Sequence, residues 1–177
     1  KPSAGMGEMK GDMAGGAVAI GTTLALAQTG CKVNLVTLIP AVENMPSGMA
    51  ARPGDIVRAL NGKTIEIIST DAEGRMTLAD AIVYGEKQGA QVIVDIATLT
   101  GACIVALGES IAGVMGNDQA LIDKLIQVSK ETGESCWQLP LYDGYNKLIE
   151  STVADVKNSG GRNASTITAG LFLRAFV

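Results

Sequence analysis

The sequence contains no histidine. The chain by itself therefore supplies neither a Ser-His-Asp nor a Cys-His catalytic group, and it offers no histidine ligand for zinc. Any chemistry carried by these residues must depend on carboxylates, lysine and arginine, together with the groups that those side chains bind.

Aromatic residues, clustered positive charge and cysteines are also scarce. Aromatics make up 3% of the chain, and 14 Lys and Arg against 18 Asp and Glu give a net charge of −4, which argues against a nucleic-acid surface in this segment. Cys31, Cys103 and Cys136 are widely spaced and form no C-x-x-C motif. They predict reduced, buried, small apolar side chains in a cytoplasmic protein.

Hydrophobic residues are abundant, at 47% of 177 residues, which is enough for one domain or a large piece of one. The chain begins at Lys1 without an initiator Met or a signal pattern. It stops inside an apolar periodic segment, 171–177, that lacks a helix-ending residue. We therefore expect a part of a longer protein.

The spacing of apolar residues predicts helices alternating with strands. Helices are expected over 6–27, 76–88 and 120–132, with a final helix after Gly160-Gly161. Strands are expected over 32–39, 91–96, 104–107 and 111–115, with a β-hairpin over 55–68 that turns at Asn61-Gly62. This alternation predicts an α/β fold whose sheet is covered on both faces. The apolar part of helix 6–27 is too short and too rich in glycine and threonine for a membrane span.

One stretch, residues 69–76, carries the most suggestive chemistry. After the second hairpin strand, an extended backbone would point Asp71, Glu73 and Arg75 to the same side. Two carboxylates this close repel each other unless a cation lies between them, and hard divalent metals prefer oxygen ligands. The alternative is a solvated acidic turn that caps the next helix, with Arg75 in a surface ion pair; a short motif alone does not decide between them.

Asp12 is a third candidate ligand. It lies beside the methionine stripe of Met9 and Met13, where the first helix becomes apolar, so a partly buried carboxylate there needs a partner. An ion pair with Lys10 or Lys1 is the alternative. In α/β sheets ligands bind beyond the carboxyl ends of strands, and the Asp71 and Thr98 turns both follow predicted strands.

Several motifs together resemble the leucine (cytosol) aminopeptidase family. They run in the family's order along nearly the whole chain: Lys1-Pro2-Ser3, M-K-G-D-M at 9–13, T-D-A-E-G-R at 70–75, D-I-A-T-L-T-G-A at 95–102, and the segments 154–158 and 167–173. The N-T-D-A-E-G-R signature is highly specific to that family. Ser69 stands where it usually has Asn, and Met76 where it usually has Leu. Because neither position carries a charged ligand, we expect altered packing rather than lost chemistry.

The resemblance implies a three-layer α/β/α catalytic domain with a central mixed, mainly parallel sheet, and a homo-hexamer in the full-length protein. It implies two divalent metal ions, Mn or Zn with Mg possible, bound by Asp12, Asp71 and a bridging Glu73. Lys1 would polarise the scissile carbonyl, and Arg75 would hold a bicarbonate. The family's N-terminal domain and two further metal ligands, a lysine and an aspartate, lie upstream of the catalytic lysine, so the 177 residues alone should have little activity.

The resemblance also implies peptide substrates with a leucine-type preference. The composition predicts no nucleic-acid partner for this segment and no membrane partner. Met9, Thr98, Leu99 and Gly101 match positions that line the family's side-chain pocket, although each could equally be ordinary core at a strand end. A non-catalytic relative with a degraded site is the alternative function. A phosphate- or nucleotide-binding module is weaker, because Lys10 occupies the place of the last glycine in a partial G-x-G-x-x-G motif.

Overall fold

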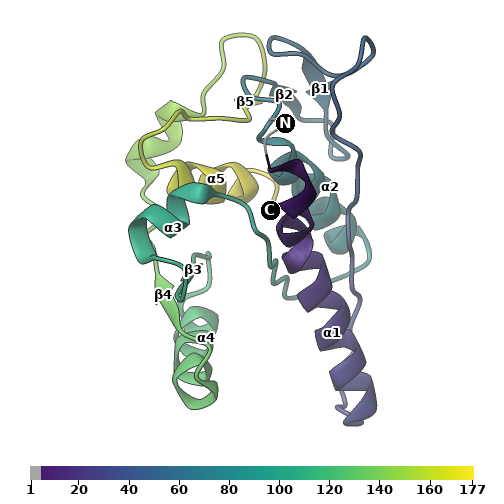
Figure 1. Ribbon diagram of the computed structural model, residues 1–177, viewed down its shortest axis with the longest axis vertical. Helices are drawn as coiled ribbons and strands as arrows, with labels where there is room; N and C mark the ends of the chain where they lie inside the picture. Colours follow the sequence, from purple (N-terminus) through teal and green to yellow (C-terminus); the bar gives the residue numbers. More distant parts are fainter. Residues whose placement is uncertain (1–4) are drawn as a thin grey trace.

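The computed structural model describes residues 5–177 and has a mixed α/β architecture (Figure 1). In chain order its elements are η1 (Met6–Met13), α1 (Ala14–Gln28), β1 (Ile56–Arg58), β2 (Thr64–Glu66), α2 (Glu73–Lys87), α3 (Gly101–Leu107), β3 (Ala112–Val114), α4 (Gln119–Thr132), β4 (Cys136–Gln138), η2 (Asp143–Leu148), β5 (Val156–Lys157) and α5 (Ser165–Arg174).

The predicted β-hairpin is confirmed and forms part of a mixed sheet. β1 pairs antiparallel with β2, and β2 pairs parallel with β5, so the strand order is β1-β2-β5. Gly62 has a φ of 92°, and its N–H donates to the carbonyl of Ala59 at 2.8 Å. This left-handed backbone is the reason that Asn-Gly is a strong hairpin signal. A second small sheet pairs β3 parallel with β4.

The core lies where α2 and α5 pack together beside the β1-β2-β5 sheet. Apolar residues repeat along each helix at spacings of three and four, which is the pattern that buries one helix face. The buried cluster comprises Ala59, Ile65, Ala79, Ile82, Val83, Ile149, Leu171, Phe172, Leu173 and Phe176. Phe172 and Phe176, one helical turn apart, hold their ring centroids 5.1 Å apart. This core fixes the end of β2 against the start of α2.

Two predicted strands are wrong in this structure. Residues 32–39 and 91–96 pair with no described segment of the sheets, and most of their side chains are exposed; Val92, for example, is 64% exposed. β-Branched apolar residues favour extended backbone, but a strand forms only where a neighbouring segment accepts and donates its backbone hydrogen bonds. The composition of these runs indicated extended backbone, but it could not show whether a neighbouring segment would pair with them.

The predicted strand over 104–107 is also wrong, because these residues belong to α3. Periodicity cannot distinguish a short apolar run in a strand from one in a helix. The predicted helices over 76–88 and 120–132 are confirmed, as is the final helix, α5. The first helix is present, although its N-terminal part, η1, is a 3-10 helix. The mixed α/β class is confirmed, whereas one central sheet within three layers stays a prediction.

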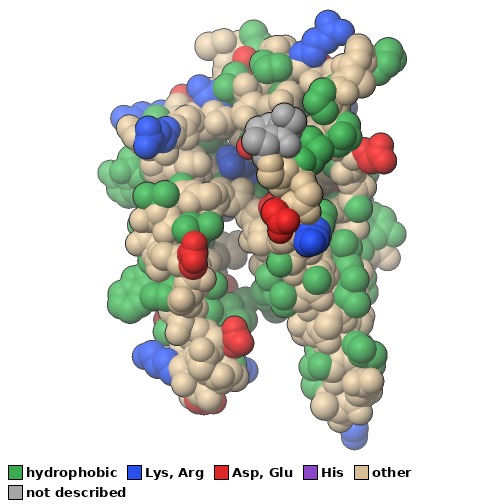
Figure 2. Space-filling view, viewed as in Figure 1, with side chains coloured by type: hydrophobic (Ala, Val, Ile, Leu, Met, Phe, Trp, Pro, Cys, Tyr) green, Lys and Arg blue, Asp and Glu red, His purple; other side chains and the backbone are tan. Residues whose placement is uncertain are grey.

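The molecule has a body and two arms (Figure 1). The body contains β1, β2, β5, α2 and α5, while α1 and α4 extend from it with their far ends apart. The space-filling view shows the same separation, with hydrophobic side chains along the α1 arm (Figure 2). Every helix within residues 5–177 is too short or too polar to span a lipid bilayer.

Candidate functional site

Residues 69–73, called the acidic turn below, lead from β2 into the first residue of α2. The Ala72 N–H donates to the Ser69 carbonyl at 3.2 Å, and the Asp71 N–H donates to Ser69 Oγ at 3.3 Å. Asp71 is exposed, and Glu73 is the first residue of α2. The premise of an extended backbone through Arg75 is therefore wrong. In a helix, residues two apart do not share a face, so Glu73 and Arg75 leave the backbone in different directions.

Arg75 is buried, at 5% exposure, which excludes the surface ion pair of the alternative interpretation. Its Nη1 donates to the Asn158 carbonyl at 3.0 Å. Burial lowers the pKa of Arg75, and the nearby Glu73 carboxylate partly offsets this effect. Within residues 5–177 the buried Nε–H finds no hydrogen-bond acceptor. A buried guanidinium with an unused donor fits an anionic ligand such as bicarbonate.

Asn158 holds the acidic turn in place. Its Oδ1 accepts from the Ile68 N–H at 2.8 Å and from the Ser69 N–H at 3.1 Å, while its Nδ2 donates to the Ser69 carbonyl at 2.7 Å. The sequence placed this residue at the end of the family segment 154–158 and predicted a flexible turn there, whereas Asn158 is fully buried. Asn158 directly follows β5, a strand parallel to β2. Ligands of α/β sheets bind beyond the carboxyl ends of strands, and Asn158 lies at such an end, as the Asp71 turn does.

Asp12 lies on η1, with its side chain exposed, and its helix packs against the loop that contains Thr98. Thr98 Oγ1 donates to the Asp12 carbonyl at 2.5 Å. Gly15 is buried at the start of α1, and a Cβ at this position would lie 2.3 Å from the Ile96 carbonyl oxygen. The structure thus brings the Asp12 helix and the Thr98 turn together.

The Thr98 loop also contacts the helix that carries Glu73. Leu99 Cδ1 lies 3.5 Å from the position that a Cβ on Gly74 would occupy, so Leu99 packs on the first turn of α2. Thr100 Oγ1 and Thr166 Oγ1 are 2.9 Å apart, which joins this loop to α5. Gly101 begins α3, and Met9 is half-buried on η1. The loop therefore connects the Asp12 and Glu73 segments.

The described residues do not by themselves form a complete metal site. Within 5–177, no group of three or more Cys, Asp or Glu side chains is arranged to hold a metal ion. Lys1 lies outside the described residues. The donor chemistry nevertheless fits, because Asp12, Asp71 and Glu73 all supply the carboxylate oxygens that hard divalent ions prefer. Their convergence around metal ions stays a prediction.

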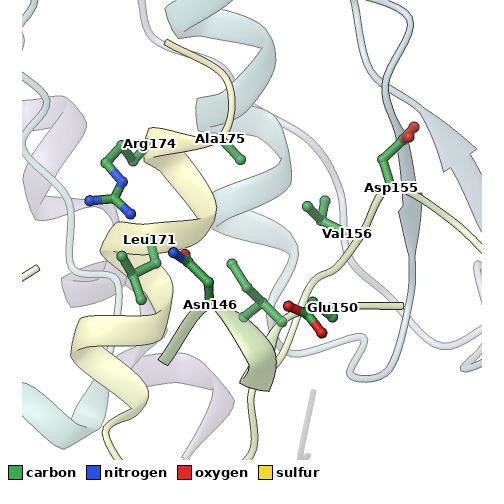
Figure 3. Close-up of a pocket in the computed structure, with 8 residues that line it drawn as sticks. Asn146, Glu150, Asp155, Val156, Leu171, Arg174 and Ala175 are labelled. Atoms are coloured by element: carbon green, nitrogen blue, oxygen red, sulfur yellow. The ribbon is translucent and has the colours of Figure 1, made fainter. Parts of the chain in front are cut away.

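Two surface pockets lie away from the acidic turn. One, of about 200 Å³, lies between η2, β5 and α5, and the Asp155 carboxylate there points away from Asn146 and Glu150 (Figure 3). The other, of about 480 Å³, lies between α1 and residues 37–39. Neither is lined by any residue of the predicted substrate pocket.

Comparison with known proteins shows a family match over the entire chain. The model of the "cytosol aminopeptidase family, catalytic domain" matches residues 1–177. A probable cytosol aminopeptidase of Geobacter sulfurreducens is 52% identical over 177 residues, which cover 100% of this chain and 36% of that protein. One from Chlorobaculum tepidum is 51% identical, with 100% and 35% covered. The cytosol aminopeptidase of Pseudomonas aeruginosa is 51% identical, with 99% and 36% covered. The chain thus spans about a third of the length of these curated relatives.

Proposed function

The chain belongs to the cytosol aminopeptidase family, and on that premise we propose that it supplies part of the catalytic domain of a metal-dependent aminopeptidase. The enzyme would release N-terminal residues, with a preference for leucine, from peptides in the cytoplasm. The observation that best supports this proposal is the acidic turn itself. Asp71 and Glu73 stand on a turn held by Asn158, beside a buried arginine with an unused donor.

Three carboxylates of this chain would bind two divalent ions, Mn or Zn or possibly Mg. Asp12 would bind one ion, Asp71 the other, and Glu73 both, with further ligands supplied by a lysine and an aspartate outside these residues. When bound, such a pair of ions supplies an activated water and polarises the peptide carbonyl. The side chains would fix the spacing of the ions because the start of α2 is packed against the core.

Arg75 would hold a bicarbonate at the site. The guanidinium is buried and anchored through Nη1, so its Nε–H is a donor in a fixed orientation. These 177 residues supply no histidine to carry a proton, and a bound bicarbonate could carry one instead. Lys1 would donate a hydrogen bond to the carbonyl oxygen of the substrate as negative charge develops on it.

The substrate side chain would lie against Met9, Thr98, Leu99 and Gly101. Leu99 packs on Gly74 at the start of α2, so the apolar contact surface would lie next to the carboxylates. An apolar pocket at this position would favour leucine or a residue of similar size. A homo-hexamer is the assembly that the family resemblance implies for the full-length protein.

The decisive test is Glu73→Gln in the full-length protein, because this change removes one charge and preserves the size of the side chain. We expect the release of leucine from leucine amide with Mn²⁺ or Zn²⁺ to fall by about 10²-fold or more, as is typical when a group that stabilises the transition state is lost. Circular dichroism and thermal unfolding would show whether the variant is folded.

The matched control is Glu134→Gln, since Glu134 is exposed in the loop before β4. It should retain the activity of the unmodified protein. Undiminished turnover by folded Glu73→Gln would contradict the bridging role. Inactivity of the unmodified full-length protein on all peptides tried would instead favour the non-catalytic alternative.

A further inference from the structure

We propose that Asn158 is a positioning residue for the aminopeptidase reaction, setting the places of the Asp71 turn and of Arg75 at once. This inference depends on the function proposed above. It concerns a residue that carries none of the metal-binding or proton-transfer roles. The supporting observations are the hydrogen bonds of Asn158, its burial, and the position of the segment that it holds.

The side chain of Asn158 bonds to both ends of a short backbone segment. Oδ1 accepts from the N–H groups of Ile68 and Ser69, and Nδ2 donates to the Ser69 carbonyl at 2.7 Å. A longer contact, 3.4 Å, joins Nδ2 to the Ala72 carbonyl. The amide thus matches the donors and acceptors of the chain between β2 and α2, which leaves this segment little freedom to shift.

The backbone of Asn158 makes two more connections. Its N–H donates to the Glu66 carbonyl at 2.9 Å, which joins it to the end of β2. Its carbonyl accepts from Arg75 Nη1 at 3.0 Å. Asn158, which directly follows β5, therefore holds three parts of the site: the end of β2, the acidic turn and the Arg75 guanidinium.

Burial makes this arrangement hard to replace. Asn158 is 0% exposed, so solvent water cannot substitute for a lost side-chain donor or acceptor. Among side chains of this size, only an amide has an acceptor on one branch and a donor on the other. Aspartate would preserve the shape and the acceptor, but its second oxygen would face the Ser69 carbonyl instead of donating to it.

A small movement of the turn would affect both proposed metal ligands on it. Asp71 lies within the segment, and Glu73 begins the helix one residue after Ala72. A displacement of about 1 Å in a catalytic arrangement can lower the rate about 10²-fold. Asn158 should therefore act on catalysis through the positions of these carboxylates and of Arg75, without touching the substrate.

Asp155 provides a matched control at the other end of the same strand pair. Its carboxylate accepts from the Thr64 N–H and from Thr64 Oγ1, each at 2.7 Å, and so joins the start of β2 to the segment before β5. An amide oxygen accepts these bonds more weakly than a carboxylate, so Asp155→Asn should loosen the sheet without moving the acidic turn. Asp155→Asn thus separates general destabilisation from a specific effect on the site.

The experiment compares Asn158→Asp and Asp155→Asn in the full-length protein. Mn²⁺ binding to the metal-free protein is followed by the electron paramagnetic resonance signal of free Mn²⁺, and kcat and KM are measured with leucine amide. For Asn158→Asp we expect Mn²⁺ affinity about 10-fold weaker or more and kcat about 10²-fold lower, with KM changed less than about 3-fold. Asp155→Asn should lower the melting temperature and leave Mn²⁺ binding and kcat unchanged.

Wild-type Mn²⁺ affinity and kcat in folded Asn158→Asp would overturn the proposal, as would equal losses in Asp155→Asn. Asn158→Ser, which buries no charge, replaces Asn158→Asp if the latter does not fold; failure of both to fold would make the residue structural and overturn the proposal. An unmodified protein without peptidase activity would refute the proposed function. Weaker Mn²⁺ binding by Asn158→Asp would then still support the positioning role.

Discussion

The body of the molecule and the α1 arm bury apolar side chains to very different extents. In the body, Phe172 is 0% exposed and lies in a cluster built from α2, α5 and the sheet. In the arm, Leu24 is 56% exposed, although its helix, α1, is more apolar than α5, which carries Phe172. Hydrophobicity alone therefore does not bury a segment. Burial requires a second surface of matching shape, which α2 and the sheet supply to Phe172 in the body.

The proposed site contains residues from both the well-packed body and the exposed arm. Asp71, Glu73 and Arg75 stand on the packed body, where Asn158 holds the turn and the core holds α2. Asp12 stands at the base of the arm, joined to the Thr98 loop through its backbone carbonyl. The carboxylates on the turn thus have stronger structural support than the one on η1.

Truncation of a core side chain should produce the largest effect and test the comparison directly. Phe172→Ala in the 177-residue chain should lower the free energy of unfolding by about 3–5 kcal/mol, because it leaves a cavity in close-packed surroundings. Leu24→Ala, in the exposed arm, should cost less than about 1 kcal/mol. Urea denaturation followed by circular dichroism measures both. Equal losses would mean that the arm is as well packed as the body.

Two glycines of α1 should respond in opposite directions. Gly15→Ala should destabilise the chain by about 1–3 kcal/mol, because the new Cβ would meet the Ile96 carbonyl oxygen at 2.3 Å. At Gly21, on the same helix, the added Cβ would meet no atom within 4 Å beyond its own helix backbone. Gly21→Ala should therefore stabilise the helix by about 0.5–1 kcal/mol. Thermal unfolding of the two variants measures the difference. Stabilisation by both changes would show that α1 does not press against Ile96 and Ala97.

The smallest expected effect is a pH dependence at the edge of the body. Hydrogen bonds from the side chain and then the backbone of Thr64 lower the pKa of Asp155 below its ordinary value of 3.8. The ionised carboxylate therefore stabilises the fold above about pH 3.8, and this contribution is lost as the pH falls through the lowered folded-state pKa. The difference in melting temperature between the unmodified chain and Asp155→Asn should shrink across that range. A difference independent of pH would show that the ionised form of Asp155 is not the stabilising one.

Local signals in the sequence were reliable where a few adjacent residues decide the backbone. Asn61-Gly62 predicted the hairpin because its turn needs a left-handed residue, and Gly62 has that conformation. The amphipathic patterns of α2 and α4 predicted helices because one apolar stripe faces a partner. The family motifs, which extend along nearly the whole chain, were confirmed by the match over residues 1–177.

Signals that depend on distant neighbours were less informative. The apolar runs 32–39 and 91–96 predicted buried strands, yet the described structure gives them no pairing segment. The spacing of Asp71, Glu73 and Arg75 suggested one shared direction, but α2 begins at Glu73 and turns Arg75 inward. Asn158 gave no local indication of its contacts, because its role comes from a strand parallel to β2.

The sequence by itself determined the hairpin turn, the amphipathic helices, the order of the acidic residues and the family. The tertiary structure alone decided that Arg75 is buried, that Asn158 holds the acidic turn, and which apolar segments enter the core. The physical reason is distance along the chain. Turn and helix preferences act within a few residues, whereas the Asn158 amide meets the Ile68 N–H across 90 positions, and only the folded chain brings the two together.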